Sequence, residues 1–317
     1  MIDVSHADRI VFPDIGTTKG DVVAYYERIA TRALAHVEGR PLSIKRFPRG
    51  LAAAGFFQKN VPAHYPASIE RFAVPRSHEA SRRHRNKDAQ QRDVTLYPVL
   101  RDPTALPYVA NQGAIELHVT LARVPDVERP DRFVIDLDPP PGALPLVRQA
   151  ALAMRDLLGE FGLQTAPMAT GSKGYHLIAA LIPSVDVQAL ALAGQKVAAL
   201  AAARHPTMLT SAFRINARGQ RVFVDWLRNN HSASVIAPLS LRARPTAPVA
   251  VPLAWAEVPD VAPDAFTIKD VDTLVDRDDP VAALQSQPCD PARFVAAVDA
   301  AFDASGLVLE PFDRFRS

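Results

Sequence analysis

The chain has 317 residues, 48% of them hydrophobic, which is enough for a large core or two closely joined subdomains. No apolar run reaches the length of a membrane span, and the first residues lack the basic-then-apolar pattern of a secretory signal. The single cysteine, Cys289, excludes an internal disulfide and fits a reducing compartment. We therefore expect a cytoplasmic protein that does not enter a membrane.

Charge is distributed unevenly along the chain, although the formal net charge is only +2. Residues 1–259 hold 31 Lys and Arg against 22 Asp and Glu, whereas residues 260–317 hold 5 against 12. A basic body suits a polyanionic partner such as nucleic acid, but ordinary surface variation in an Arg-rich chain would give the same totals. We expect residues 260–317 to be an acidic C-terminal extension that is either a solvated face or a cover for basic surface.

Apolar spacing predicts the elements of the first half. A loop over residues 6–19 precedes a helix over 20–37, whose apolar residues recur at three- and four-residue steps. Alternation predicts a strand over 41–47, and further strands are expected at 94–100 and 117–119, with a short helix or turn at 111–116. Residues 76–92 hold six Lys and Arg against two acids without periodicity, which is typical of a basic surface loop: either a nucleic-acid contact or a solvated insertion.

The second half alternates strands with longer helices. The expected order is a strand over 133–138, a helix over 147–161, strands over 164–170 and 175–180, a helix over 187–204 and a strand over 221–228. Small helices are expected near 280–285 and 291–304.

Two acids lie at the end of the first of these strands. Asp136 and Asp138 are two residues apart, so on a strand their side chains point the same way. Two carboxylates this close repel each other, and a divalent cation bound by oxygen ligands is the usual remedy. The alternative is a strand end whose acids cap a helix or meet arginines, and this stretch alone does not decide between the two.

A third acid, Asp225, follows the apolar run Val222-Phe223-Val224, where an unpaired carboxylate is unfavourable. If its strand neighbours that of Asp136, the three acids form one cluster. Such a cluster can hold two divalent cations about 4 Å apart, which activate a hydroxyl and stabilise a leaving phosphate oxygen.

A Gly-containing turn and several basic residues could hold phosphate. Thr170-Gly171-Ser172-Lys173-Gly174 with His176 offers backbone N–H groups, hydroxyls and a cation, although such a stretch taken alone is more often a purely structural polar turn. It is not a P-loop, because a strand follows it instead of a helix. The candidate triphosphate ligands elsewhere are Arg228, Arg242 and Arg244. Taken alone, residues such as His118, Phe56 and Phe57 are more often core residues than ligands or stacking platforms.

Several blocks, in this order along the chain, resemble the polymerase domain of bacterial ligase D, a member of the archaeo-eukaryotic primase superfamily. The blocks are GRPL at 39–42, GFFQKN at 55–60, ELH at 116–118, FVIDLDPP at 133–140, GSKGYH at 171–176, VFVDW at 222–226 and APLSLRAR at 237–244. The resemblance runs from about residue 5 to 260. No ligase nucleophile motif is present, so the chain resembles the stand-alone actinobacterial relatives more than a slice of a multidomain ligase.

The resemblance implies an α+β primase-polymerase fold, with two mixed or antiparallel sheets flanked by helices and the active site between them. We expect a catalytic domain over residues 1–259, with subregions 1–132 and 133–259, followed by the extension 260–317. The implied activity is template-directed nucleotidyl transfer with two Mn²⁺ ions, Mg²⁺ being a substitute. Ribonucleotides are preferred over deoxyribonucleotides, and one or a few are added at short gaps or breaks that carry a downstream 5′-phosphate.

The resemblance also implies roles for single residues. Asp136, Asp138 and Asp225 would be the catalytic metal ligands. The nucleotide would be held by Thr170, Ser172, Lys173, Gly174, His176, Arg228, Arg242, Arg244, Arg46 and His118. DNA would be contacted by Arg9, Lys19, Phe56, Phe57 and Lys59, with Arg9 and Lys19 on the 5′-phosphate, although the family commonly has lysine at the position of Arg9.

The implied partners are DNA with gaps or 5′-phosphorylated ends, rNTPs and dNTPs, with the protein acting as a nucleoid-associated monomer. One alternative is a polymerase module that works with Ku and a DNA ligase in non-homologous end joining. An alternative of a different class is a non-catalytic DNA-end-binding protein.

Overall fold

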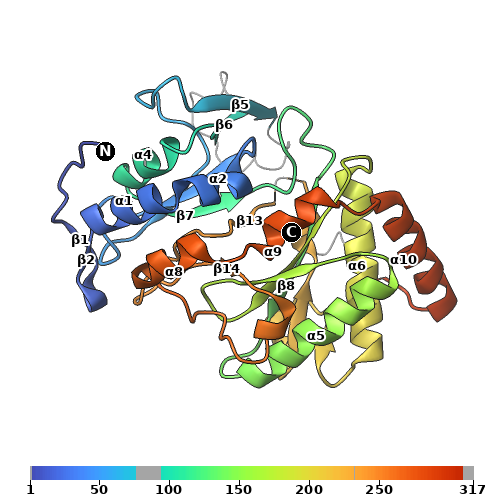
Figure 1. Cartoon of the computed structure of the whole chain (residues 1–317). Helices are drawn as coiled ribbons and strands as arrows, with labels where there is room; N and C mark the ends of the chain where they lie inside the picture. Colours follow the sequence, from blue (N-terminus) through green and yellow to red (C-terminus); the bar gives the residue numbers. More distant parts are fainter. Residues whose placement is uncertain (1, 76–93, 232, 310–317) are drawn as a thin grey trace. The chain divides into compact units, whose positions relative to one another are not determined.

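The computed structural model describes residues 2–75, 94–231 and 233–309, so the basic loop predicted at 76–92 lies outside the described residues (Figure 1). The chain forms two compact units, each built from three stretches of sequence. Unit 1 comprises residues 1–125, 234–249 and 266–277, and unit 2 comprises residues 126–233, 250–265 and 278–317. Each unit has its own sheet, and the predicted α+β class with mixed and antiparallel sheets is confirmed.

Unit 1 is built on a four-stranded sheet with the order β13-β7-β3-β4, accompanied by two two-stranded sheets, β1-β2 and β5-β6. Its strands are β1 (Ile10–Phe12), β2 (Thr17–Thr18), β3 (Leu42–Arg46), β4 (Phe56–Gln58), β5 (Glu70–Pro75), β6 (Val94–Val99), β7 (Ala114–Val119) and β13 (Val235–Ile236). Its helices are α1 (Lys19–Arg28), α2 (Ala30–Val37), α4 (Ala105–Asn111) and α8 (Val271–Asp276).

The helix predicted over residues 20–37 is two helices, α1 and α2. The first begins in a capping box, in which the Thr18 hydroxyl accepts from the Asp21 N–H and the Asp21 carboxylate accepts from the Thr18 N–H. Ile29 alone separates the two helices as a turn residue (φ −92°, ψ 0°), and the buried stripe continues in phase on both sides. A one-residue interruption does not shift the apolar period, so the sequence pattern did not reveal it.

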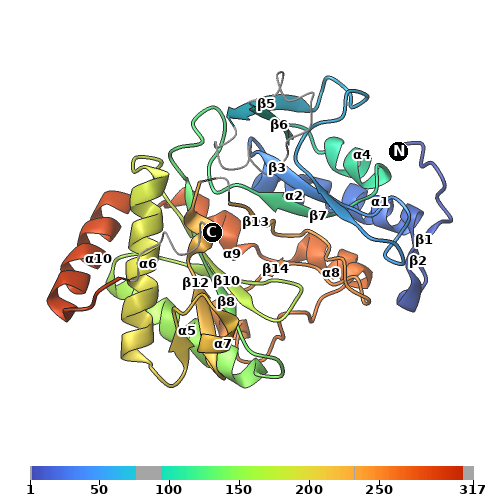
Figure 2. The same cartoon turned by 180° about the vertical axis from the view of Figure 1, so that it is seen from behind.

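Unit 2 is built on a six-stranded sheet with the order β11-β12-β8-β10-β9-β14, in which β12, β8 and β10 lie side by side (Figure 2). Its strands are β8 (Arg132–Asp138), β9 (Ala166–Ala169), β10 (Tyr175–Ala180), β11 (Leu209–Thr210), β12 (Val222–Asp225) and β14 (Val251–Pro252). Its helices are α5 (Leu144–Glu160), α6 (Val187–Arg204), α7 (Ile215–Arg218), α9 (Pro280–Ala283) and α10 (Pro291–Ser305).

Helices cover one face of the unit 2 sheet, and α10 lies beside α6 (Figure 1). On β8, Phe133 is fully buried, and its ring meets that of Phe294 of α10 at 5.1 Å between centroids. Gly194 of α6 leaves room for the same Phe133 ring. Because side chains alternate along a strand, this packing turns Asp136 and Asp138 to the opposite face.

No helix in the described part of the chain is both long and apolar enough to cross a membrane.

Several strand boundaries differ from the predictions. The strand expected at 117–119 begins at Ala114, and the helix expected over 111–116 lies upstream as α4. The strand expected over 221–228 ends at Asp225, where a 3₁₀ turn, η3 (Leu227–Asn229), replaces its last residues. Tertiary pairing decides these ends, since β12 pairs with β8 only as far as Asp136.

The buried side chain of Asn229 replaces a strand partner beyond the end of that pairing. Its amide accepts from the Val134 N–H at 2.9 Å, and it donates to the carbonyl oxygens of Val134 at 2.6 Å and Trp226 at 3.0 Å. Asn229 thus satisfies the edge of β8 that β12 leaves open and fixes η3, which carries Arg228, to the same strand.

We predict that Asn229→Ala lowers the free energy of unfolding by about 2–4 kcal/mol, because it leaves the buried N–H and carbonyl of Val134 without partners. Chemical denaturation would measure the loss. Asn230→Ala is the matched control, since that side chain makes one bond, to Leu227 O at 3.1 Å, and we expect it to cost about 1 kcal/mol or less. Equal losses for the two variants would contradict this role of Asn229.

Candidate active site

The three predicted metal ligands lie together on one face of the unit 2 sheet. In the strand register Asp136 lies opposite Asp225 on β12 and opposite His176 on β10, so the three side chains form one row across the sheet. Asp138 lies two residues farther along β8, opposite Phe223, on the same face. One carboxylate oxygen from each of the three aspartates lies within 4.8 Å of the others.

The aspartate cluster is largely buried but remains open at one end. Asp136 and Asp225 are 9% and 5% exposed, and the side chain of Asp138 is 27% exposed. Three carboxylates at this spacing are the oxygen donors that divalent cations such as Mg²⁺ and Mn²⁺ prefer. The residues therefore fit a metal site.

Basic side chains partly neutralise the cluster. The Arg228 guanidinium bridges two of the acids, with Nε 3.2 Å from Asp136 Oδ2 and Nη2 3.2 Å from Asp225 Oδ2. His176 Nε2 lies 3.5 Å from Asp136 Oδ2, and Lys173 Nζ lies 3.3 Å from Asp138 Oδ1. The predicted nucleotide ligands Arg228, Lys173 and His176 are thus placed directly against the predicted metal ligands.

Asp136 and Asp225 respond in opposite ways to this environment. Burial opposes ionisation of Asp136, but the adjacent His176 and Arg228 outweigh it and lower its pKa to about 2. Burial, reinforced by the charge of Asp136, raises the pKa of Asp225 to about 6, and Arg228 and the Leu227 N–H offset this only in part. Of these two acids, Asp225 is the one whose negative charge is less fully compensated by nearby positive charge.

The turn between β9 and β10 is held against the metal ligands by close backbone packing. A Cβ on residue 174 would lie 1.9 Å from the carbonyl oxygen of Leu137, the residue between Asp136 and Asp138 on β8. Only glycine can therefore pack against the backbone of β8 at this point. The Thr170 hydroxyl and N–H both donate to Gly174 O, and the Gly171 N–H donates to Pro263 O. These groups close the turn, while Lys173 is exposed and Ser172 is half-buried.

Unit 1 gathers a second group of predicted residues around a buried acid. On β7, Glu116 accepts from His118 Nε2 at 2.9 Å and lies 3.6 Å from both Lys45 Nζ and Arg242 Nε. We call these four residues the Glu116 cluster. Lys45 also lies over the ring of Phe57, which packs edge-on against His118 at 5.2 Å.

Arg46 does not belong to the Glu116 cluster. It follows Lys45 on β3 and therefore points to the other face of the sheet, where its guanidinium binds Gln112 O and Gln58. There it lines a cavity of about 200 Å³ together with Arg9 and Lys19. The structure thus places one predicted nucleotide ligand with the two residues predicted to bind a 5′-phosphate.

The cavity that contains Arg9 and Lys19 has a cationic lining. Lys19 is buried and donates to Ser5 O at 2.6 Å and Ser5 Oγ at 2.8 Å, while Arg9 donates to Pro48 O. Burial, and after it the charge of Arg9, lower the pKa of Lys19.

The remaining predicted residues are surface side chains. Phe56 and Phe57 are 48% and 55% exposed on β4, which makes a core role untenable for either. Lys59 and Arg244 are exposed as well.

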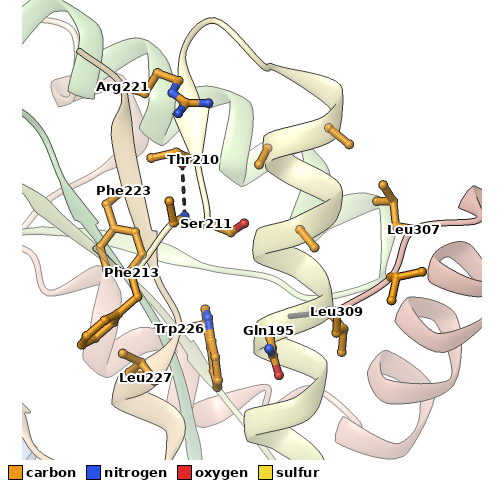
Figure 3. Close-up of a pocket in the computed structure, with 15 residues that line it drawn as sticks. Gln195, Thr210, Ser211, Phe213, Arg221, Phe223, Trp226, Leu227, Leu307 and Leu309 are labelled. Carbon is orange, nitrogen blue, oxygen red and sulfur yellow. Dashed lines mark hydrogen bonds between the residues drawn. The ribbon is translucent and has the colours of Figure 1, made fainter. Parts of the chain in front are cut away.

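A separate cavity of about 440 Å³ lies in unit 2 between α6, β12 and residues 307–309 (Figure 3). Phe213, Trp226 and Gln195 line it, and none of the predicted site residues does so. Phe223 of its wall lies two residues before Asp225 on β12, and the Arg218 guanidinium stacks over that ring at 3.7 Å.

Comparison with known proteins shows the family of the chain. Residues 18–281 match the family model of the LigD primase-polymerase domain. The chain belongs to this family. It is thus a nucleotidyltransferase of the primase-polymerase type, and the resemblance inferred from the sequence blocks is confirmed.

Several relatives are full-length end-joining proteins. The chain is 34% identical over 288 residues to the multifunctional non-homologous end joining DNA repair protein LigD of Mycobacterium tuberculosis, covering 87% of this chain and 36% of that protein. It is 30% identical over 273 residues to the bifunctional LigD of Bacillus subtilis, covering 85% of this chain and 41% of that protein. The chain therefore spans less than half of the length of these relatives.

A solved structure is similar over nearly its whole length. The polymerase domain of Mycobacterium tuberculosis ligase D, in complex with DNA, superposes with a TM-score of 0.81 at 32% identity and covers 91% of this chain and 99% of that one. The fold of the family thus extends over most of the described chain.

Three residues that contact or position predicted site residues were not predicted from the sequence. Lys45 precedes the predicted residue Arg46, and Glu116 lies two residues before the predicted residue His118, but neither was given a role. Asn229 was not singled out. For Glu116 the available signal was the two-residue strand period that it shares with His118, whereas for Lys45 there was none, because only the pairing of β3 with β7 places it opposite Glu116. For Asn229 there was none, because its contacts depend on where β12 ends.

We predict opposite stability effects for two neutral isosteres in metal-free protein. At pH 7 Asp225→Asn should raise the free energy of unfolding and Asp136→Asn should lower it, each by about 1–3 kcal/mol, since one pKa unit corresponds to about 1.4 kcal/mol. Folding raises the pKa of Asp225, so its ionisation penalises the folded state above pH 6 and no longer does so below about pH 4. Folding lowers the pKa of Asp136, so its contribution persists at pH 4 and is lost only toward pH 2.

Thermal unfolding with a chelator, at pH 7 and pH 4, would measure both effects. The higher stability of Asp225→Asn relative to wild-type protein should vanish at pH 4. If both variants changed the unfolding temperature in the same direction at pH 7, this would contradict the conclusion that Arg228 and His176 stabilise chiefly the charge of Asp136.

Proposed function

We propose that this chain is a template-dependent primase-polymerase that adds one or a few nucleotides, preferably ribonucleotides, at short gaps or breaks with a downstream 5′-phosphate. The observation that carries the proposal is the aspartate cluster on the unit 2 sheet, with Lys173 and Arg228 in contact with it, in a chain of the LigD primase-polymerase family. DNA repair is the process that needs this reaction.

The metal in this proposal is Mn²⁺, with Mg²⁺ as a substitute and two ions per site. Bound at Asp136, Asp138 and Asp225, such ions would lower the pKa of a primer 3′-hydroxyl and neutralise a triphosphate. The protein's own contribution is position: the row across β12, β8 and β10 fixes two of the carboxylates against each other, and Asn229 anchors the turn that carries Arg228.

In the proposal, each unit by itself has a group of nucleotide ligands. In unit 2, Ser172 and the exposed Lys173 offer a hydroxyl and a cation beside Asp138. In unit 1, His118 and Arg242 are held at Glu116, and Arg244 is exposed three residues after Leu241. Arginine and lysine donors suit a triphosphate because they match its charge and its many acceptor oxygens.

The proposed DNA contacts lie on unit 1. The solved relative is a ligase D polymerase domain in complex with DNA, which supports DNA as the substrate. Arg9 and Lys19 line one cavity of about 200 Å³, and the exposed rings of Phe56 and Phe57 are available to stack on an unpaired base.

The names of the relatives favour one more specific version of this function. They are non-homologous end joining proteins, so the chain could act with Ku and a DNA ligase as their polymerase module. A Ku pull-down would separate this version from a polymerase that fills gaps without Ku.

We predict that wild-type protein extends a primer across a one-nucleotide, 5′-phosphorylated gap with Mn²⁺, faster with rNTPs than with dNTPs. Asp136→Ala and Asp138→Ala should abolish extension while gap binding, measured by fluorescence anisotropy, stays within about twofold, because the metal ligands hold the reacting groups and not the duplex. The matched control is Asp126→Ala, an exposed ion pair of the same unit with Arg129. Absence of extension by wild-type protein with tight gap binding would instead support a non-catalytic end-binding protein.

A second prediction concerns the downstream phosphate. Replacing Arg9 and Lys19 together by Ala should weaken binding to a 5′-phosphorylated gap by about tenfold or more, and should barely change binding to the 5′-hydroxyl gap, because both cations line the same small cavity. Anisotropy titrations on the two substrates would measure the difference. An equal loss on both would remove the phosphate-specific role.

A further inference from the structure

We propose that Glu116 is a positioning residue that holds His118, Arg242 and Lys45 in the orientation that binds the triphosphate. This inference rests on the proposed function, because it concerns the nucleotide ligands named there. It assigns a role to a buried acid that carries none in the proposed reaction.

The contacts of Glu116 use both of its carboxylate oxygens. Oε2 accepts from His118 Nε2 at 2.9 Å, and Oε1 accepts from the Ala243 N–H at 3.0 Å. Oε1 also lies 3.6 Å from Lys45 Nζ and from Arg242 Nε. A single carboxylate therefore reaches three basic side chains and the backbone of the loop that carries Arg242.

The strand register brings these groups together. On the antiparallel pair β3–β7, Lys45 lies opposite Glu116 and Ser43 lies opposite His118, so all four side chains share one face. The loop with Arg242 is held separately, since the Leu117 N–H donates to Ser240 Oγ at 2.8 Å and the Leu241 N–H donates to the Tyr26 hydroxyl oxygen at 3.1 Å. The loop is thus fixed beside Glu116 from two sides.

The balance of charge points to an anionic ligand. Glu116 supplies one negative charge at 3% exposure, while Lys45 and Arg242 alone supply two positive charges. The basic side chains keep part of their surface open, at 30% for Lys45, 18% for Arg242 and 15% for His118. Several basic side chains thus surround one carboxylate, and each keeps part of its surface open to solvent, where an anion can reach it.

The pKa shifts of Glu116 and His118 are consistent with this role. Burial opposes the charge on Glu116, but His118, Arg242 and the Ala243 N–H outweigh the effect of burial and lower the pKa of Glu116 to about 2. The Glu116 carboxylate therefore stays charged. Burial lowers the pKa of His118, and Arg242 and Lys45 lower it further, while Glu116 is the one neighbour that raises it.

Two roles of Glu116 predict opposite changes in anion binding when its charge is removed. If Glu116 only repelled phosphate or only stabilised the fold, Glu116→Gln would tighten anion binding or leave it unchanged, because the cluster becomes more positive. If Glu116 positions the basic side chains, the same change weakens anion binding despite the added positive charge. The sign of the effect therefore decides between the roles.

The test compares wild-type protein with Glu116→Gln, Glu116→Asp and the control Glu70→Gln. Gln keeps the length and loses the charge, whereas Asp keeps the charge and loses the reach. Glu70→Gln makes the same chemical change in an exposed pair with Arg101 on unit 1, 2.9 Å apart. Thermal unfolding would confirm that each variant is folded.

The first readout is calorimetric binding of inorganic tripolyphosphate, which requires no catalysis. We expect both Glu116 variants to bind it about tenfold or more weakly, and Glu70→Gln to match wild-type protein. In Mn²⁺-dependent extension, KM for the rNTP should rise in the same proportion, with a smaller change in kcat. Unchanged or tighter tripolyphosphate binding by folded Glu116→Gln would overturn the proposal.

The second readout is the titration of the His118 ring, followed by NMR. Glu116→Gln should lower the His118 pKa, since it removes the one neighbour that raises it, and Glu70→Gln should not move it. A His118 titration that does not respond to Glu116→Gln would also overturn the proposal. Failure of the proposed function is distinguishable, because it appears as absence of extension by wild-type protein, whereas failure of this inference appears in the variants' anion binding and His118 titration.

Discussion

Placing carboxylates close together away from water is the constraint on which the unit 2 site depends. Asp136 and Asp225 face each other across two paired strands, and neither has enough water around it to screen their repulsion. Arg228 bridges them, His176 supports Asp136, and the remaining imbalance falls on Asp225. A cluster that is incompletely neutralised by its own protein is one that a divalent cation can complete.

The same constraint explains the supporting structure around the acids. Arg228 can bridge the pair only if η3 is fixed, and the amide of Asn229 fixes it to the open edge of β8. Gly174 lets the turn that carries Lys173 lie directly on the Leu137 carbonyl, between the two aspartates. Unit 1 uses the inverse arrangement, in which one buried carboxylate, Glu116, gathers several basic side chains.

Alternation and apolar spacing predicted much of both arrangements. The shared orientation of Asp136 and Asp138 follows from the two-residue strand period, and the helix α6 was predicted at its observed bounds, 187–204, from its composition. Arg46 shows the limit of such reasoning. Period two places Lys45 and Arg46 on opposite faces, but it does not say which face carries the Glu116 cluster, and only the pairing of β3 with β7 decided that.

The sequence by itself determined the family, the α+β class and which three aspartates form the acidic cluster. Ordered blocks and strand periodicity can be read from the chain without its tertiary contacts. Tertiary structure alone decided which basic residues meet which acids: Arg228 and His176 at Asp136, Lys45 at Glu116, and Arg46 beside Arg9 and Lys19. These pairings depend on strand register, strand ends and the side of a sheet to which a side chain points. Such features are set by contacts between residues distant in sequence, so no local pattern specifies them.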